Sequence, residues 1–158
     1  LEKNYDQSVE IKTCNLLKSK QEKFNFNVSD VQSEPVFGLP KKYLYEPNSA
    51  IMKSGAFDLI SSKFLIIKLH QNSHLYTSDI LMDFPGRIFE IENNVAYQKK
   101  EMKLFLENKK ANITTRNFPE SAEIIRKKWK IKDGGNLYCF FTTNENDAKI
   151  VLLCSKLK

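Results

Sequence analysis

The 158-residue sequence lacks the glycine-rich signatures of nucleotide-binding enzymes. No GxGxxG, GxxxxGK[ST] or GxSxG pattern occurs, and the whole chain has five glycines. The acidic strand end and glycine loop with which Rossmann-type folds hold a nucleotide-like cofactor are missing as well. We therefore do not expect a self-sufficient nucleotide-dependent enzyme, and these motifs assign no cofactor-binding and no catalytic residue.

Cysteine and histidine are also scarce. Cys14, Cys139 and Cys154 form no CxxC pair, which argues against a zinc ribbon, and an odd number leaves one thiol outside any disulfide. All three lie in apolar runs, so we expect buried, unreactive thiols in a reducing, cytoplasmic protein. His70 and His74 have the spacing of a helical zinc pair, but they flank a predicted turn, so we expect hydrogen-bonded structural roles and no metal site.

Long apolar runs are absent. None approaches the roughly 18 residues that a membrane-spanning helix needs, and residues 1–23 are polar and charged, unlike a secretion signal. Apolar residues make up 41% of the chain and charged residues 28%, a composition that excludes wholesale disorder. Since the first residue is Leu1 and not methionine, we expect the chain to be a piece of a longer protein or a processed form.

The net charge of +6 is concentrated in one segment. Residues 99–132 hold 11 basic and four acidic residues, whereas residues 1–98 hold 11 basic and 12 acidic residues and residues 133–158 hold three of each. A basic segment of this kind binds phosphate-rich partners through counterion release. It is also typical of a solvated, lysine-rich helix face, and for the basic segment taken alone this second interpretation is favoured.

The first half of the chain is predicted to consist of strands with one helix. Proline suits the first turn of a helix, so the helix is expected from Pro47 to Ser62. Prolines, a glycine and polar residues predict a loop over residues 29–40. Strands are expected over residues 9–17, 24–28, 64–69 and 75–78.

The second half of the chain has the predicted order β-α-β-α-β-β. Strands are expected from residue 87 to a turn at Asn93-Asn94, and over 111–116, 137–143 and 149–153. Helices are expected over 99–109 and from Pro119 to the glycine pair at 134–135. In the second helix, Phe118, Ala122, Ile125 and Trp129 share one face. The order predicts an α+β fold of sheet and helices packed on one face.

Two segments contain candidate ligand-binding residues. Arg87 follows the turn at residues 83–86, where its guanidinium can either bind phosphate or pair with Asp83. Residues 112–119, NITTRNFP, offer polar donors just before a helix, including Arg116.

Two neighbours of Arg116 have more than one possible role. Asn117 either contacts nucleic acid or caps the helix. Phe118 either stacks on a base or anchors the core, and the core role is favoured.

Several motifs resemble a known family. YLYEPN at residues 43–48 is similar to the start of the C-terminal region in a family of bacterial class I S-adenosylmethionine-dependent methyltransferases. Residues 68–78 and FPGRIF at 84–89 resemble the Bacteroidetes-type branch of that family. Further matching positions are Ala50, Lys53, Gly55 and Ala56. Matches to the THUMP-like part of the family are residues 113–119, 124–131 and 132–135.

The resemblance covers residues 43–158 and implies two small α/β sandwich units with antiparallel or mixed sheets. By this resemblance residues 43–87 are ferredoxin-like and residues 88–158 are THUMP-like. Residues 1–42 would be N-terminal strands and a linker, or the end of an upstream Rossmann-like catalytic domain. The parent enzyme would use S-adenosylmethionine, and a THUMP-like domain implies binding of ribosomal or transfer RNA. Where another branch has a KKRG-like run, this chain has TTRN, so only Arg116 keeps the charge.

The hypothesis that combines these observations is a non-catalytic C-terminal module that recognises RNA and positions it for methylation. Its candidate RNA-binding residues are Arg87, Arg116, Asn117, Lys127, Lys128, Lys130 and Lys132. One alternative is a packing or dimerisation domain without RNA contact. Another is a small hydrolytic or metal site formed by His70, His74 and Arg87.

Overall fold

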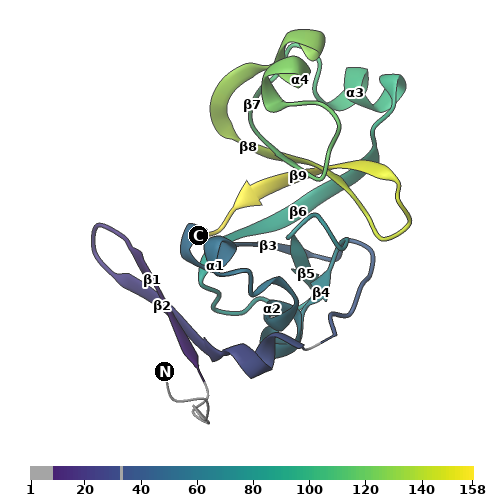
Figure 1. Ribbon diagram of the computed structural model, residues 1–158. Coiled ribbons are helices and arrows are strands. Elements are labelled where there is room, and N and C mark those ends of the chain that lie inside the picture. Colours follow the sequence, from purple (N-terminus) through teal and green to yellow (C-terminus); the bar gives the residue numbers. More distant parts are fainter. Residues whose placement is uncertain (1–8, 33) are drawn as a thin grey trace.

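The computed structural model describes residues 9–32 and 34–158 (Figure 1). An antiparallel hairpin of β1 (Glu10–Leu16) and β2 (Gln21–Asn27) comes first and projects beside the rest of the molecule. Alternation along β2 buries Phe24 and Phe26, and the Thr13 hydroxyl donates to the Phe24 carbonyl at 2.7 Å. Both predicted strands are confirmed. The short 3-10 helix η1 (Val28–Gln32) follows the hairpin.

A single seven-stranded sheet forms the centre of the molecule, in the order β4-β5-β3-β6-β9-β8-β7. Its strands are β3 (Tyr43–Pro47), β4 (Ile67–Lys68), β5 (Tyr76–Ser78), β6 (Gly86–Ala96), β7 (Lys110–Arg116), β8 (Lys132–Thr143) and β9 (Lys149–Lys156). Neighbouring strands are antiparallel except β7 and β8, which are parallel. The fold is therefore mixed α/β, as predicted, with one sheet running through both expected units.

The helix expected over residues 47–62 is wrong in its extent. Pro47 ends β3, and the Asn48 side chain caps the following helix by accepting the backbone N–H groups of Ala50 and Ile51, each at 3.1 Å. Gly55 then adopts a left-handed conformation with φ of 76°, which ends the first helix. The result is two short helices, α1 (Ser49–Ser54) and α2 (Phe57–Phe64).

Several boundaries in the second half also differ from expectation: the first helix ends at Phe105 and not at residue 109, and β8 begins at Lys132 and not at residue 137. β6 continues through the predicted turn at residues 93–94, because a bulge at this point lets it pair with β9 on both sides. After α3 (Lys99–Phe105), helix α4 (Ala122–Trp129) begins three residues after Pro119, with Ser121 as its N-cap. Lys130, at φ of 54°, ends α4 before the glycine pair, which lies inside β8.

Apolar clusters pack on both faces of the sheet. The face that carries the helices has two clusters: one includes Tyr45 and Ile60 and packs with α1 and α2, and the other includes Ile125 and Phe141 and packs with α3 and α4. A third cluster is built from alternate strand positions, Leu44, Phe89, Phe140 and Leu152, and therefore lies on the opposite face. None of the described helices is long and apolar enough to cross a membrane.

The three cysteines differ in their burial. Cys139 and Cys154 are buried as predicted, and burial raises the pKa of the Cys139 thiol to about 12. Cys14 is exposed, so the expected burial is wrong there. The reason is that β1 belongs to a hairpin with one covered face, and Cys14 lies on the other face, next to the buried Thr13.

Candidate nucleic-acid interface

Strands β7 and β8 begin side by side, each shortly after a helix. Lys110 is opposite Lys132 in the parallel register, and the Lys132 N–H donates to the Lys109 carbonyl at 2.9 Å. The exposed lysines at this place come from the last turn and C-cap of α4, from the residue before β7, and from the first residues of β7 and β8. We call this group the lysine end; its members are Lys109, Lys110, Lys127, Lys130 and Lys132.

The lysine end keeps its charge free of internal partners. In the part of the chain that the structure describes, none of its five side chains forms an ion pair. The neighbouring carboxylate, Asp133, instead accepts from Arg126 at 2.5 Å, and Arg126 also donates to the Ala111 carbonyl at 3.0 Å. The acid is thereby neutralised by a different residue, and the lysines remain available to an anionic partner.

A glycine bulge lies against the lysine end. Asp133 pairs with Ala111 while Tyr138 pairs with Asn112, so residues 134–137 have no opposite residue on β7. Gly134 and Gly135 have φ of 94° and 84°, a region that favours glycine. The Asn112 amide holds the bulge by donating to the Gly135 carbonyl at 2.8 Å. The glycine pair therefore does not end a helix, as the sequence led us to expect, but forms a bulge of β8 beside Lys110.

Lys128 has surroundings unlike those of the other predicted lysines. Its ammonium donates to the Tyr97 hydroxyl at 3.1 Å and to the Glu120 carboxylate at 3.0 Å, and both contacts raise the pKa of Lys128. It also lies 5.2 Å above the Tyr97 ring and 5.6 Å above the Trp129 ring. These contacts use Lys128 to hold α4 against the strand ends.

Asn117 and Phe118 take up roles between strands. Asn117 has φ of 50°, its amide lies 2.9 Å from His70 Nδ1, and its carbonyl accepts from the Thr143 hydroxyl at 2.6 Å. It does not cap α4, so the capping alternative is wrong. Phe118 packs edge to face on Tyr97 and Phe141, with ring centroids 5.0 and 5.6 Å away, which confirms the core role.

The two histidines have different environments. The His70 Nδ1 atom accepts the Asn72 N–H at 3.0 Å, and its Nε2 lies 3.1 Å from the Asp147 carboxylate, a hydrogen-bonded role of the kind expected. His74 stacks on the Phe57 ring at 3.7 Å, and burial lowers the pKa of His74. Its buried Nδ1 has no hydrogen-bond partner among the described residues, so the expected hydrogen-bonded role is not found at that atom. Among the described residues, no three side chains of metal-ligating type form a cluster.

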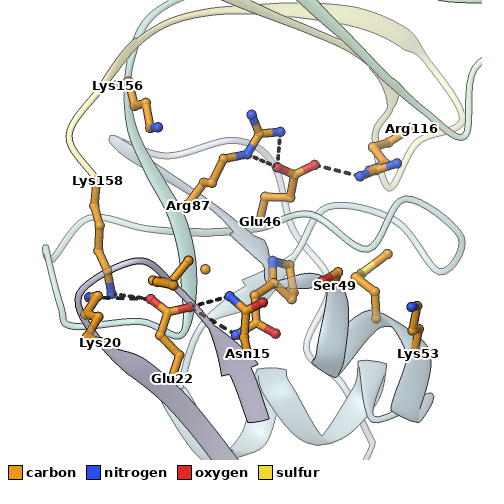
Figure 2. A pocket seen from close by; sticks show the side chains of 15 residues that line it. Asn15, Lys20, Glu22, Glu46, Ser49, Lys53, Arg87, Arg116, Lys156 and Lys158 are labelled. Carbon is orange, nitrogen blue, oxygen red and sulfur yellow. Dashed lines mark hydrogen bonds and ion pairs between the residues drawn. The ribbon is translucent and has the colours of Figure 1, made fainter. Parts of the chain in front are cut away.

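Arg87 and Arg116 meet at one buried carboxylate. Glu46, only 3% exposed, accepts from Arg87 Nε at 2.6 Å and from Arg116 Nη2 at 2.8 Å, and Figure 2 shows the two arginines reaching it from opposite sides. The predicted partner of Arg87, Asp83, pairs with Lys158 at 3.1 Å instead. Glu46 was missed because the strand that places it opposite Arg87, β3, was not expected.

These arginines line a cavity of about 640 Å³ between the hairpin, α1 and the ends of β6, β7 and β9 (Figure 2). We call it the basic cavity; its charged lining residues are Lys20, Glu22, Glu46, Lys53, Arg87, Arg116, Lys156 and Lys158. The second carboxylate, Glu22, is 8% exposed and accepts from the amides of Asn15 and Asn48 at 3.2 and 3.1 Å. Burial raises the pKa of Glu22, but these hydrogen bonds and one from Lys158 outweigh burial and lower it overall.

The structure thus divides the predicted RNA-binding residues among four places. Lys127, Lys130 and Lys132 are in the lysine end. Lys128 packs on aromatic rings, Asn117 contacts His70, and the two arginines line the basic cavity. Segment charge counting could not have found the basic cavity, because its lysines are scattered through a nearly neutral stretch and the last strand.

Comparison with known families agrees with this architecture. Residues 43–85 match a family model described as a ferredoxin-like domain, and residues 86–156 match one described as THUMP domain-like. The chain contains a ferredoxin-like domain followed by a THUMP-like domain. The lysine end therefore belongs to the THUMP-like domain. Arg116 comes from that domain too, whereas its partner Glu46 comes from the ferredoxin-like domain.

One solved structure supports the likeness over nearly the whole chain. It is described as "putative methyltransferase from Porphyromonas gingivalis W83" and superposes with a TM-score of 0.86 at 34% sequence identity. The match covers 95% of this chain and 38% of that one, so the present chain corresponds to well under half of the Porphyromonas protein. No curated protein matches the chain.

Proposed function

We propose that this chain recognises RNA and positions it for methylation, as the non-catalytic C-terminal part of a cytoplasmic, S-adenosylmethionine-dependent methyltransferase. The THUMP-like domain supports RNA as the partner, and the likeness to the Porphyromonas protein supports a methyltransferase as the parent. The methyl donor and the reacting groups would then belong to a Rossmann-like domain elsewhere in the parent. Transfer RNA and ribosomal RNA both suit this proposal.

The observation that carries the proposal is the lysine end. Five exposed lysines that form no ion pair among the described residues lie within a few positions of the starts of two hydrogen-bonded strands, so positive charge is concentrated there. Each phosphate that such a surface neutralises releases counterions, which gives affinity independent of sequence and sensitive to salt. Contacts to the backbone of RNA fix orientation rather than sequence, which is the task of a positioning domain.

Helix dipoles provide a competing reason for some of these lysines. Lysines at the carboxyl ends of helices stabilise the last turn, and Lys127 lies in the last turn of α4. That explanation does not reach Lys109, Lys110 and Lys132, which lie outside both helices. The collection of all five at one edge is better explained by an external anion.

The test is fluorescence anisotropy with transfer RNA and a ribosomal RNA fragment, titrated from low to physiological salt. We compare the unmodified chain with the triple variant K127A/K130A/K132A and with the matched variant K18A/K23A/K149A, which removes equal charge from exposed lysines elsewhere. We expect micromolar, salt-dependent binding, and the lysine-end variant should reduce the log–log salt slope by about 2–3 units. Equal effects of the two variants, or no binding at low salt, would overturn the proposal.

One observation favours the alternative of a packing or dimerisation domain. Leu65 is 88% exposed, and Ile80 and Leu81 are also exposed on the ferredoxin-like domain. An apolar surface of this kind suits contact with another protein surface. Sedimentation equilibrium distinguishes RNA recognition from packing or dimerisation. A dimer that the I80S/L81S variant abolishes, together with no RNA binding, favours the packing or dimerisation domain.

A further inference from the structure

We infer that the basic cavity binds the phosphate of a nucleotide, either free or at the end of an RNA strand. The cavity is formed by the hairpin, the ferredoxin-like domain and strand ends of the THUMP-like domain, and it contains no member of the lysine end. The inference therefore stands apart from the proposed RNA surface.

Charge is the first reason for the inference. Six cationic side chains line the cavity against two carboxylates, an excess of four positive charges. Both carboxylates are nearly buried and already engaged, Glu46 by two arginines and Glu22 by two amides and two lysines. Lys53 and Lys156 form no ion pair among the described residues. An anionic ligand would neutralise the excess positive charge of the lining.

The arginines are the second reason. Arg87 bonds one Glu46 oxygen through Nε and Nη2, and Arg116 bonds the other oxygen through Nη2. A guanidinium has five N–H donors, so each arginine keeps others for a ligand. Arg116 Nε is buried and has no hydrogen-bond partner among the described residues. Glu46 thus holds two guanidinium groups in place with spare donors, and that geometry suits bidentate contact with a phosphate.

Size and apolar lining point to a nucleotide and not to phosphate alone. The volume of about 640 Å³ lies within the usual range of about 300–1,000 Å³ for small-molecule sites. Leu17, Pro47 and Met52 contribute apolar surface to the lining. Such surface can cover the flat face of a base while the cations hold its phosphate.

The experiment must distinguish ligand binding from a purely structural role of the charged residues that line the basic cavity. Glu46 could simply clamp two domains together through Arg87 and Arg116, and that role would not need Lys53 or Lys156. Both lysines are exposed and form no ion pair among the described residues, so reversing their charge should leave the folded state intact. They are therefore the residues to change.

Isothermal titration calorimetry at low salt provides the test, with AMP, adenosine and an RNA pentamer carrying or lacking a 5′-phosphate. We expect AMP to bind and adenosine to bind at least tenfold more weakly. K53E/K156E should weaken AMP binding at least tenfold and lower the melting temperature by no more than about 4 °C, since Lys53 lies in the last turn of α1. The matched variant K103E/K149E should leave AMP binding unchanged. Pentamer binding that is tighter than AMP and depends on its phosphate identifies an RNA end as the source, and equal affinity identifies a free nucleotide.

Two results would overturn the inference: no AMP binding, or equal loss of AMP binding in both charge-reversal variants. The lysine-end variant K127A/K130A/K132A separates this site from the proposed RNA surface, because it should retain full AMP affinity. A chain that binds AMP but not transfer RNA would refute the proposed function alone. A chain that binds transfer RNA through the lysine end but not AMP would refute this inference alone.

Discussion

Replacing Glu46 by glutamine should destabilise the fold far more than loss of an ordinary surface ion pair. The carboxylate is 3% exposed and accepts from two guanidinium groups, whose side chains are 41% and 37% exposed. A hydrogen bond to a charged group contributes about 1.5–3 kcal/mol, and the partial exposure of both arginines reduces this. The two arginines bond different oxygens of Glu46, so glutamine keeps an acceptor for one arginine and turns an NH2 donor toward the other. We therefore expect E46Q to lower the free energy of unfolding by about 2–3 kcal/mol.

Urea unfolding followed by circular dichroism measures the effect. The expected loss corresponds to a melting temperature lower by about 5–10 °C for a chain of this size. The control is E90Q, because Glu90 is 40% exposed and pairs with Lys42 at 3.6 Å; removing that pair should change stability by less than about 0.5 kcal/mol. If E46Q has as small an effect as E90Q at an unchanged m value, the reasoning that one buried carboxylate joins the two domains is refuted.

Three further predictions concern backbone, thiol and pH. A Cβ at Gly86 would lie 2.1 Å from the Glu46 carbonyl oxygen, so G86A should lower the free energy of unfolding in urea by about 3 kcal/mol. The control G55A should lower it by about 1 kcal/mol, because there only the positive φ opposes alanine. Equal losses in the two variants would contradict the prediction. Ellman's reagent at pH 8 should modify the exposed Cys14 in the native protein and Cys139 only after unfolding, because burial raises the pKa of Cys139 to about 12; rapid native labelling of both would contradict the burial. Burial lowers the pKa of His74 below its ordinary 6.5, so the contribution of His74 to stability is complete above pH 6.5 and decreases as the pH falls below that value. H74N should flatten that part of the stability profile, and an unchanged profile would contradict the prediction.

The strands with alternating or β-branched sequences were predictable from the sequence. β1, β7 and β9 lie close to where their patterns placed them, and Ile125 and Trp129 are buried on the expected face of α4. β3 was missed because Leu44 to Pro47 is buried at every position, which removes the period-two signal of a half-exposed strand. Its proline also favoured a helix start.

The basic cavity could not be predicted because its contacts join distant parts of the chain. Glu46 and Arg116 are 70 positions apart, and only the pairing of β3 with β6 and of β7 with β8 brings them together. The lysine end was partly predictable, since the charge count located the basic segment. The parallel register of β7 and β8 was needed to show that Lys109 and Lys110 join Lys130 and Lys132.

The sharpest test of RNA recognition is to map by ¹⁵N–¹H NMR where transfer RNA contacts the chain. We expect amides at residues 108–111 and 126–135 to shift or broaden first, the effect to weaken with rising salt, and K127A/K130A/K132A to remove it. Perturbations confined to the exposed apolar residues of the ferredoxin-like domain, or none at low salt, would contradict RNA recognition by the lysine end.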